Sequence, residues 1–374
     1  MKFIIAPDSF KESMTACEAA VAIEEGIHQY CSSVETLLCP LSDGGEGTLE
    51  TLIHAMNGEM RYYVVKGPLF LDIKAPIGYV DDIAIIECAK VCGLELLNDS
   101  QKNPHQTTTY GLGQLMKHAL DHGSRKLMIC LGGSATNDGG IGMLLALGVS
   151  FLDNSFHQVQ WTMDGLKDIC YIDETHLDKR LQEIEIIGVC DVDNPLCGEK
   201  GATAIYGPQK GLLKHEIESV DNDMKRYAQL CDEKHHYDYR YISGAGAAGG
   251  LGYALISFAN GQLLPGFEVV AKVLSLEEKI SSCDCVIVGE GKIDAQTQYG
   301  KTPYGVLKLA QKYHKKVYAF AGKVEDKDIL KQLGFSGIFE ISPRDIPLSH
   351  ALKCGKEYLK ESVNQHIEEI INEI

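Results

Sequence analysis

Short apolar runs alternate with amphipathic stretches along the chain, a pattern typical of α/β proteins. Residues 3–6 form an apolar run of strand length, and Thr15 with Glu18 forms a capping box that opens a helix. A second apolar run at 37–41 leads into a glycine-rich turn and another helix. Repeated strand–loop–helix units of this kind predict a parallel sheet.

The pattern changes in the middle of the chain. Apolar runs at 73–80 and 83–86, joined by two aspartates, predict an antiparallel hairpin. Strand–helix alternation then resumes, and the last strands resemble the first ones in kind. We therefore expect an α/β fold with two domains and a cleft between them. Residues 1–60 and 265–374 would build a discontinuous Rossmann-like parallel-sheet domain, and residues 61–264 an inserted second α/β domain.

Composition agrees with a folded protein of two domains and excludes several partners. The 374 residues are 45% apolar and 23% charged, and they exceed what one core usually covers. A formal net charge of −17 disfavours nucleic acid and anionic membranes. The 13 cysteines are odd in number and scattered, which indicates reduced thiols rather than disulfides or zinc ligands. Without a signal peptide or an apolar run of about 18 residues, a cytoplasmic location is expected.

Residues that could bind a ligand or take part in catalysis lie in loops at the ends of predicted strands. Glycines there let backbone N–H groups approach phosphate oxygens, while carboxylates near phosphate imply a divalent cation or a proton acceptor. Turns and helix caps use the same residue types, so one such loop would say little. Together the loops indicate phosphoryl transfer with magnesium; they lie at 7–11, 42–47, 132–140, 191–194 and 289–294.

Other motifs resemble known nucleotide sites and are discounted. Residues 299–302 look like the end of a P-loop, but Ala295 stands where that loop needs a glycine. Residues 244–249 match the dinucleotide fingerprint, with Glu268 near the distance of a ribose contact. The run that precedes them, 235–241, is polar and aromatic rather than a buried strand, which disfavours NAD.

Several longer blocks resemble, in order, the signatures of the bacterial class I glycerate kinases, the glycerate 2-kinase family. The blocks are APDSFK at 6–11, DGGEGT at 43–48, GGSATNDGG at 132–140, CDVDNPLCG at 190–198, YGPQKG at 206–211, the glycine-rich stretch 244–252 and GEGKID at 289–294. The resemblance implies an ATP-dependent kinase that phosphorylates D-glycerate, in most relatives to 2-phosphoglycerate. Glu12 in place of a glycine, the absence of a threonine at 110–113, and Lys292 in place of an arginine depart from the family pattern.

Roles for individual residues follow as hypotheses. Asp191 or Asp193 would accept the hydroxyl proton, with Asp8 or Asp43 as rivals, and Lys11 would neutralise phosphate or the glycerate carboxylate. Mg²⁺ would be held by one or two of Asp43, Asp138, Asp191 and Asp294. Substrate and nucleotide contacts are predicted for Ser9, Asp43, Gly44, Gly45, Glu46, Gly133, Ser134, Thr136, Asn137, Asn194, Lys210, Gly249, Gly250, Glu290 and Lys292.

Two alternative functions remain at this point. One is a non-catalytic nucleotide- or sugar-phosphate-binding protein, and the other is an NAD-dependent oxidoreductase that uses residues 244–249. The sequence also leaves open which hydroxyl of glycerate is phosphorylated, with 3-phosphoglycerate the less favoured product, and it allows a homo-oligomer.

Overall fold

The computed structural model describes residues 1–299, 301–343 and 346–374. The chain forms two compact units, each assembled from separate segments. Unit 1 comprises Met1–Asp43, Glu50–Asn57 and Gly266–Ile374, and unit 2 comprises Gly44–Leu49 and Gly58–Pro265. No helix among the described residues is long and apolar enough to cross a membrane.

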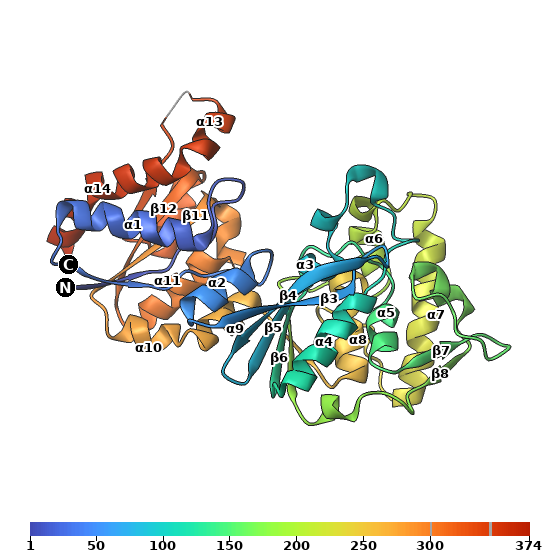
Figure 1. Cartoon of the computed structure of the whole chain (residues 1–374). Helices are drawn as coiled ribbons and strands as arrows, with labels where there is room; N and C mark the ends of the chain where they lie inside the picture. Colours follow the sequence, from blue (N-terminus) through green and yellow to red (C-terminus); the bar gives the residue numbers. More distant parts are fainter. Residues whose placement is uncertain (300, 344–345) are drawn as a thin grey trace. The chain divides into compact units, whose positions relative to one another are not determined.

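Unit 1 contains a five-stranded parallel sheet built from both ends of the chain. The strand order is β13-β12-β11-β1-β2, so the first strand lies inside the sheet next to a strand from the last third of the chain. In Figure 1 these strands combine the blue and the orange parts of the chain. Their bounds are β1 Lys2–Ile5, β2 Glu35–Leu38, β11 Cys285–Ile293, β12 Lys316–Val324 and β13 Gly337–Glu340.

The helices of unit 1 cover this sheet, and the first and last of them pack on each other. Helix α1 (Ala16–Tyr30) begins with the predicted capping box of Thr15 and Glu18. It lies beside α14 (Gly355–Glu373), and a side chain at Gly26 would come within 2.7 Å of a carbonyl oxygen of α14. The other helices are α2 Thr48–Ala55, which begins in unit 2, α9 Gly266–Val273, α10 Leu276–Ser281, α11 Thr302–Lys312, α12 Lys327–Leu333 and α13 Leu348–Lys353.

Unit 2 contains a mixed six-stranded sheet in the order β10-β9-β6-β5-β4-β3. The four strands from β10 to β5 are mutually parallel, whereas β4 pairs antiparallel with both of its neighbours, β5 and β3. The predicted hairpin is confirmed, because Val80 pairs with Ile83 and Asp81 adopts the positive φ of 52° that such short turns use. The strands are β3 Glu59–Lys66, β4 Asp72–Val80, β5 Ile83–Glu87, β6 Lys126–Cys130, β9 Glu185–Val189 and β10 Gln262–Leu264, with a separate pair β7 Ser150–Leu152 and β8 Tyr171–Asp173.

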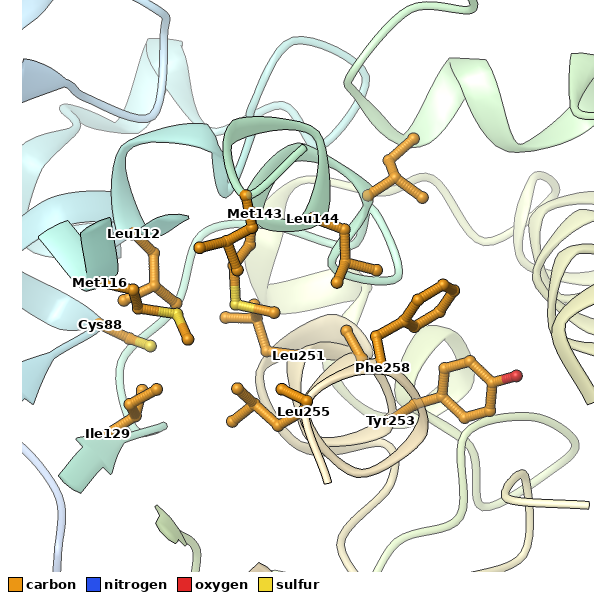
Figure 2. Packing of buried hydrophobic residues seen from close by; sticks show 14 of the residues in the cluster. Cys88, Leu112, Met116, Ile129, Met143, Leu144, Leu251, Tyr253, Leu255 and Phe258 are labelled. Atoms are coloured by element: carbon orange, nitrogen blue, oxygen red, sulfur yellow. The ribbon is translucent and has the colours of Figure 1, made fainter. Parts of the chain in front are cut away.

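The core of unit 2 lies where its helices pack on the sheet. Figure 2 shows Met116, Met143 and Leu251 from three helices gathered near Ile129 of β6, and all four side chains are fully buried. Each such side chain stabilises the fold by about 1.5–3 kcal/mol relative to exposure. The α-helices are α3 Ala89–Cys92, α4 Tyr110–His122, α5 Ile141–Ala146, α6 Ala202–Tyr206, α7 Ile217–His235 and α8 Leu251–Phe258. The expected α/β class, with a parallel sheet from both chain ends and an inserted sheet, is therefore confirmed.

Candidate active site

Asp8 lies just beyond the carboxyl end of β1 in unit 1, and both of its carboxylate oxygens accept a hydrogen bond. The Thr302 hydroxyl donates to Oδ2 at 2.6 Å, and the backbone N–H of Ser9 donates to Oδ1 at 2.6 Å. The backbone of Asp8 is also fixed, because its N–H donates to the carbonyl oxygen of Gly289 on β11 at 2.8 Å. Asp8 is therefore a partly buried carboxylate with a defined orientation.

Asp43 follows β2, the neighbour of β1, and its carboxylate interacts electrostatically with that of Asp8. Burial, and then the Asp43 carboxylate, raise the pKa of Asp8 to about 6, against the hydrogen bonds from Thr302 and Ser9 that act to lower it. A carboxylate with this pKa is mostly ionised at neutral pH and still accepts a proton far more readily than an ordinary aspartate. The structure thus brings two of the predicted aspartates, Asp8 and Asp43, close together.

Glu290 on β11 adds a third carboxylate to this part of unit 1. Its side chain is buried, and Lys301 donates to its Oε1 at 2.8 Å. Burial raises the pKa of Glu290 to about 7; the ammonium of Lys301 opposes this, and the charges of Asp8 and Asp294 add to it. The ammonium of Lys301 therefore already balances the charge of the Glu290 carboxylate.

Lys292 and Asp294, both predicted to act on phosphate or magnesium, pair with each other. The Lys292 ammonium lies 3.1 Å from Asp294 and 2.8 Å from Glu325. Burial acts to raise the pKa of Asp294, but the ammonium of Lys292 and the N–H of Gln296 hold it below its ordinary value. Because two carboxylates already neutralise Lys292, this arrangement does not favour a phosphate contact there.

The loop after Asp8 contains the exposed Lys11 next in sequence to the buried Phe10. Glu12 stands where the resembled family has glycine, and its φ of 63° lies in the left-handed region that glycine enters most easily. Although residue 12 is not glycine, its backbone keeps a conformation suited to glycine, and the Glu12 side chain adds strain there.

In unit 2 the glycine-rich loop 132–140 follows β6 and packs against a second glycine-rich segment. Gly249 has a φ of 71°, and a Cβ there would lie 2.0 Å from the carbonyl oxygen of Thr136. The N–H of Gly139 donates to the carbonyl oxygen of Gly249 at 2.9 Å, and a Cβ on Gly250 would lie 2.6 Å from the Cα of Gly139. The dinucleotide-like glycines therefore serve a close contact between two backbones.

The segment before these glycines contains no strand in the part of the chain that the structure describes: α7 ends at His235, and turns follow. The dinucleotide interpretation lacks its strand, as expected. Of the P-loop-like segment, Gly300 lies outside the described residues, while Lys301 and Thr302 contact Glu290 and Asp8.

Lys210 is a buried lysine that donates hydrogen bonds to the glycine-rich loop 132–140. Its ammonium donates to the Ser134 hydroxyl at 2.9 Å and to the carbonyl oxygen of Thr136 at 2.7 Å, and the side chain is 2% exposed. Burial lowers the pKa of Lys210 to about 8, although the nearby Asp138 carboxyl acts to raise it. Lys210 was predicted to contact substrate, which stays a prediction; the contacts that the structure shows are with the loop.

Two buried oxygens of this loop have no hydrogen-bond partner among the described residues: Thr136 Oγ1 and Asn137 Oδ1. The Asn137 amide is otherwise fixed, because its Nδ2 donates to the Thr203 hydroxyl at 3.0 Å. Buried polar atoms are nearly always paired in native proteins, so these oxygens are candidates to receive a ligand group or a water.

Asp138 is fully buried and already bonded. Its Oδ2 accepts from the N–H and the hydroxyl of Thr109, at 2.9 and 2.8 Å, and its Oδ1 accepts from the N–H of Gly140 at 3.0 Å. Burial raises the pKa of Asp138 despite these bonds. This aspartate joins the start of α4 to the glycine-rich loop, a structural role that competes with metal binding.

The loop that contains Gly44, Gly45 and Glu46 is anchored by Glu87 at the end of β5. The two carboxylate oxygens of Glu87 accept from the N–H groups of Gly47 at 3.0 Å and Leu49 at 3.2 Å. Gly45 approaches the second loop closely, since a Cβ on Gly132 would lie 3.0 Å from its Cα. Two glycine-rich loops of unit 2 are thus held together at the ends of β5 and β6.

Asp191 and Asp193 follow β9 and are exposed. Asn194 next to them is fixed: its Nδ2 donates to the carbonyl oxygen of Lys200 at 2.8 Å, and its Oδ1 accepts from the Tyr206 hydroxyl. In the ranges that the structure describes, no three His, Cys, Asp or Glu side chains form a ready-made metal cluster. Mg²⁺ does not require one, because it usually binds one or two carboxylates and substrate phosphates.

Sequence reasoning missed Thr302 and Glu87. Glu87 is the polar residue that ends an apolar strand, and that signal could have found it. Thr302 is separated from Asp8 by 294 positions, and nothing in the local pattern indicates that the two side chains meet.

Glycine-rich loops and oriented carboxylates at the ends of parallel strands are typical of α/β enzymes that bind phosphate groups. Residues 3–371 match the model of the Glycerate kinase family, and the chain belongs to this family, as the sequence blocks predicted.

The relatives agree over nearly the whole length. The chain is 42% identical to a glycerate kinase of Bacillus subtilis, over 97% of this chain and 96% of the relative. It is also 42% identical to the glycerate 2-kinase of Escherichia coli K12, over 91% and 90% of the two chains. The crystal structure of a putative glycerate kinase 2 from Salmonella typhimurium LT2 superposes with a TM-score of 0.91 at 41% identity, and it covers 100% of this chain and 98% of that one.

Proposed function

We propose that this chain transfers the γ-phosphoryl group of ATP to the 2-hydroxyl of D-glycerate and releases 2-phosphoglycerate. Membership of the Glycerate kinase family across residues 3–371 supports the reaction, and the relative named glycerate 2-kinase supports the position of transfer. The observation in the structure that carries the proposal is Asp8, a carboxylate bonded on both oxygens with a pKa raised to about 6.

Asp8 would act as the proton acceptor. As the substrate oxygen forms its bond to phosphorus and the bond from phosphorus to ADP breaks, the hydroxyl proton passes to the Asp8 carboxylate. Its raised pKa leaves it ionised at neutral pH and suited to hold that proton. Asp191 and Asp193, which the sequence favoured for this role, are exposed side chains and become the rival candidates.

The glycine-rich loops of unit 2 would bind the nucleotide phosphates. The Thr136 hydroxyl and backbone amides near Gly133 and Ser134 could donate to phosphate oxygens, and Asn137 Oδ1 could accept from a ligand hydroxyl or a water. Lys11 is exposed and would supply positive charge to a phosphate or to the glycerate carboxylate. The other proposed contacts remain predictions: Ser9, Asp43, Gly44, Gly45, Glu46, Asn194, Gly249, Gly250, Glu290 and Lys292.

Magnesium would be held by phosphate oxygens and by Asp191, whose side chain is exposed beyond the end of β9. Among the four predicted ligands, Asp138 uses both oxygens on Thr109 and Gly140, and Asp294 is paired with Lys292. The charge of Asp43 raises the pKa of Asp8, and a magnesium ion bound to Asp43 would oppose this effect. Bound there, Mg²⁺ would neutralise charge on the phosphates. A cytoplasmic location and a homo-oligomer stay predictions.

A direct assay tests the reaction. ADP formation is measured with ATP, MgCl₂ and D-glycerate, and again without D-glycerate. NADH formation is measured separately with NAD and D-glycerate, which tests the oxidoreductase alternative. We expect ADP formation that depends on D-glycerate. The proton-coupled ³¹P signal of the product distinguishes the isomers, since phosphate on the C2 oxygen couples to one proton and phosphate on the C3 oxygen couples to two. Binding of ATP without turnover would favour the non-catalytic alternative.

Two variants test the residue roles, with Asp82→Asn, at an exposed position of unit 2, as a control for lost charge. Asp8→Asn should lower kcat by about 10²–10⁴-fold. Asp191→Asn should mainly raise the Mg²⁺ concentration needed for half-maximal rate. If Asp8→Asn keeps near wild-type kcat while Asp191→Asn loses it, the proton acceptor is Asp191.

A further inference from the structure

Thr302 contacts Asp8 through a partly buried hydrogen bond to a residue outside its own helix. Helix α11 begins at Thr302, and its N-cap position is Lys301. A threonine at the N-cap would accept a bond from the helix backbone, but Thr302 lies one position further on and donates its hydroxyl to Asp8 Oδ2 at 2.6 Å. With 1% exposure, this hydroxyl cannot rely on solvent for a partner.

Among the residues that the structure describes, the other groups near Asp8 do not fix its side chain in this way. Asp43, beyond β2, and Glu290, on β11, are carboxylates, and their charges repel that of Asp8. Lys301 is the adjacent cation, but its ammonium lies 2.8 Å from Glu290 Oε1 and also donates to the carbonyl oxygen of Lys292. The Ser9 N–H bonds to the other oxygen, Oδ1, from the next residue in the chain.

A carboxylate that accepts a proton must hold one lone pair in line with the substrate hydroxyl. Each carboxylate oxygen has two lone-pair sites, and the bonds from Ser9 and Thr302 occupy one on each oxygen. The donor Ser9 is the next residue in the same loop as Asp8, whereas Thr302 lies at the start of helix α11. Two donors from separate parts of unit 1 therefore fix the plane of the carboxylate.

We propose that Thr302 is a positioning residue for phosphoryl transfer: its hydroxyl orients the Asp8 carboxylate so that a remaining lone pair can accept the substrate proton. This inference rests on the proposed role of Asp8. It gives the Lys301-Thr302 pair, part of the segment that resembles a P-loop, a task unrelated to a P-loop: Lys301 balances Glu290, and Thr302 orients Asp8.

The test compares Thr302→Val, which keeps the shape and removes the hydroxyl, with Thr302→Ser, which keeps the hydroxyl. Loss of a hydrogen bond to a charged acceptor predicts that kcat of Thr302→Val falls about ten- to hundredfold. The KM values for D-glycerate and ATP should stay within about twofold, since Thr302 contacts Asp8 rather than substrate. Thr302→Ser should recover kcat to within about threefold of wild type.

A double-mutant cycle separates positioning from general stability. In the Asp8→Asn background, adding Thr302→Val should change kcat by less than about twofold, because the two residues act as one unit. Equal losses in both backgrounds would overturn the inference, as would a wild-type kcat for Thr302→Val. If the valine variant does not fold, Thr302→Ala replaces it in the same cycle.

The outcomes for Asp8 and Thr302 can be told apart. Wild-type activity of Asp8→Asn would exclude Asp8 as the proton acceptor and would also refute this inference. Loss of activity in Asp8→Asn, together with full activity in Thr302→Val, would leave the proposed function intact and refute only the positioning role.

Discussion

Lys210 offers a quantitative test of how the glycine-rich loop of unit 2 is built. Its ammonium is buried and donates hydrogen bonds to Ser134 and Thr136, and burial lowers its pKa from 10.5 to about 8. At 1.36 kcal/mol per pH unit, this shift corresponds to about 3 kcal/mol by which the fold disfavours the charged form. Lys210→Met removes the titrating group and keeps most of the side-chain volume.

The sign of the pH dependence follows from proton binding. Below pH 8 both the folded and the unfolded chain carry the proton on Lys210, and the cost of burying the charge is present in full. Between pH 8 and 10.5 the unfolded chain keeps the proton and the folded chain loses it, so stability rises with pH. Relative to Lys210→Met, the wild-type protein should gain roughly 2–3 kcal/mol between pH 7 and pH 10.

Urea denaturation at pH 7, 8.5 and 10 measures this gain. The single tryptophan, Trp161, lies in unit 2, so its fluorescence reports on the unit that contains Lys210. The variant also loses the hydrogen bonds to Ser134 and Thr136, at about 1–3 kcal/mol for each group left unpaired. The neutral amine still donates both bonds, so this loss is the same at every pH. Only the change of the stability difference with pH tests the buried charge.

Lys214→Met is the matched control, because it removes an exposed lysine four positions further along the chain. Its stability difference from wild type should not grow with pH. A constant difference between wild type and Lys210→Met from pH 7 to pH 10 would refute the reasoning that burial of this ammonium sets its pKa.

Three other predictions concern the loops and Asp8. The acid limb of the profile of kcat/KM against pH should have its midpoint near pH 6, because Asp8 must be ionised and its pKa is raised to about 6; a midpoint near 4 would contradict its role. Gly249→Ala should destabilise unit 2 by about 3 kcal/mol or more in urea denaturation, since its Cβ would lie 2.0 Å from the Thr136 carbonyl oxygen. Glu87→Gln can accept only one of the bonds from Gly47 and Leu49 through its amide oxygen, so the KM for ATP should rise with little loss of stability; an unchanged KM would separate this loop from nucleotide binding.

The sequence predicted much of the fold because the relevant signals are local. The capping box of Thr15 and Glu18, the turn at Asp81 and the apolar run of β1 all depend on near neighbours, and each is present. Strand lengths were less predictable: β11 continues from Cys285 to Ile293, beyond its apolar stretch, because pairing with β12 extends through Lys292 and Lys323. Polar residues inside a paired strand give no signal in the hydrophobic pattern.

Part of the candidate site could likewise be predicted from the sequence, and part of it could not. Asp8 and the glycine-rich loops could be found from residue type and position at strand ends. The burial of Lys210 could not, because a lysine in a polar stretch is usually exposed, and only the packing of the loop around it shows otherwise. The hydrogen bond from Thr302 to Asp8 joins distant parts of the chain, so it depends on the completed fold rather than on any local pattern.

The place of β1 within the sheet of unit 1 has a consequence for the order of folding during synthesis. β1 pairs with β11 through Phe3 and Cys285, so the ribosome must make about three-quarters of the chain before this pairing can form. Most of unit 2 is one continuous segment, from Gly58 to Pro265, and it is complete before β11 emerges. The nascent protein therefore holds its first strand, with the apolar side chains of Phe3, Ile4 and Ile5, without its central neighbour until late in translation. Asp8, at the end of that strand, acquires its contacts with Gly289 and Thr302 only at this last stage.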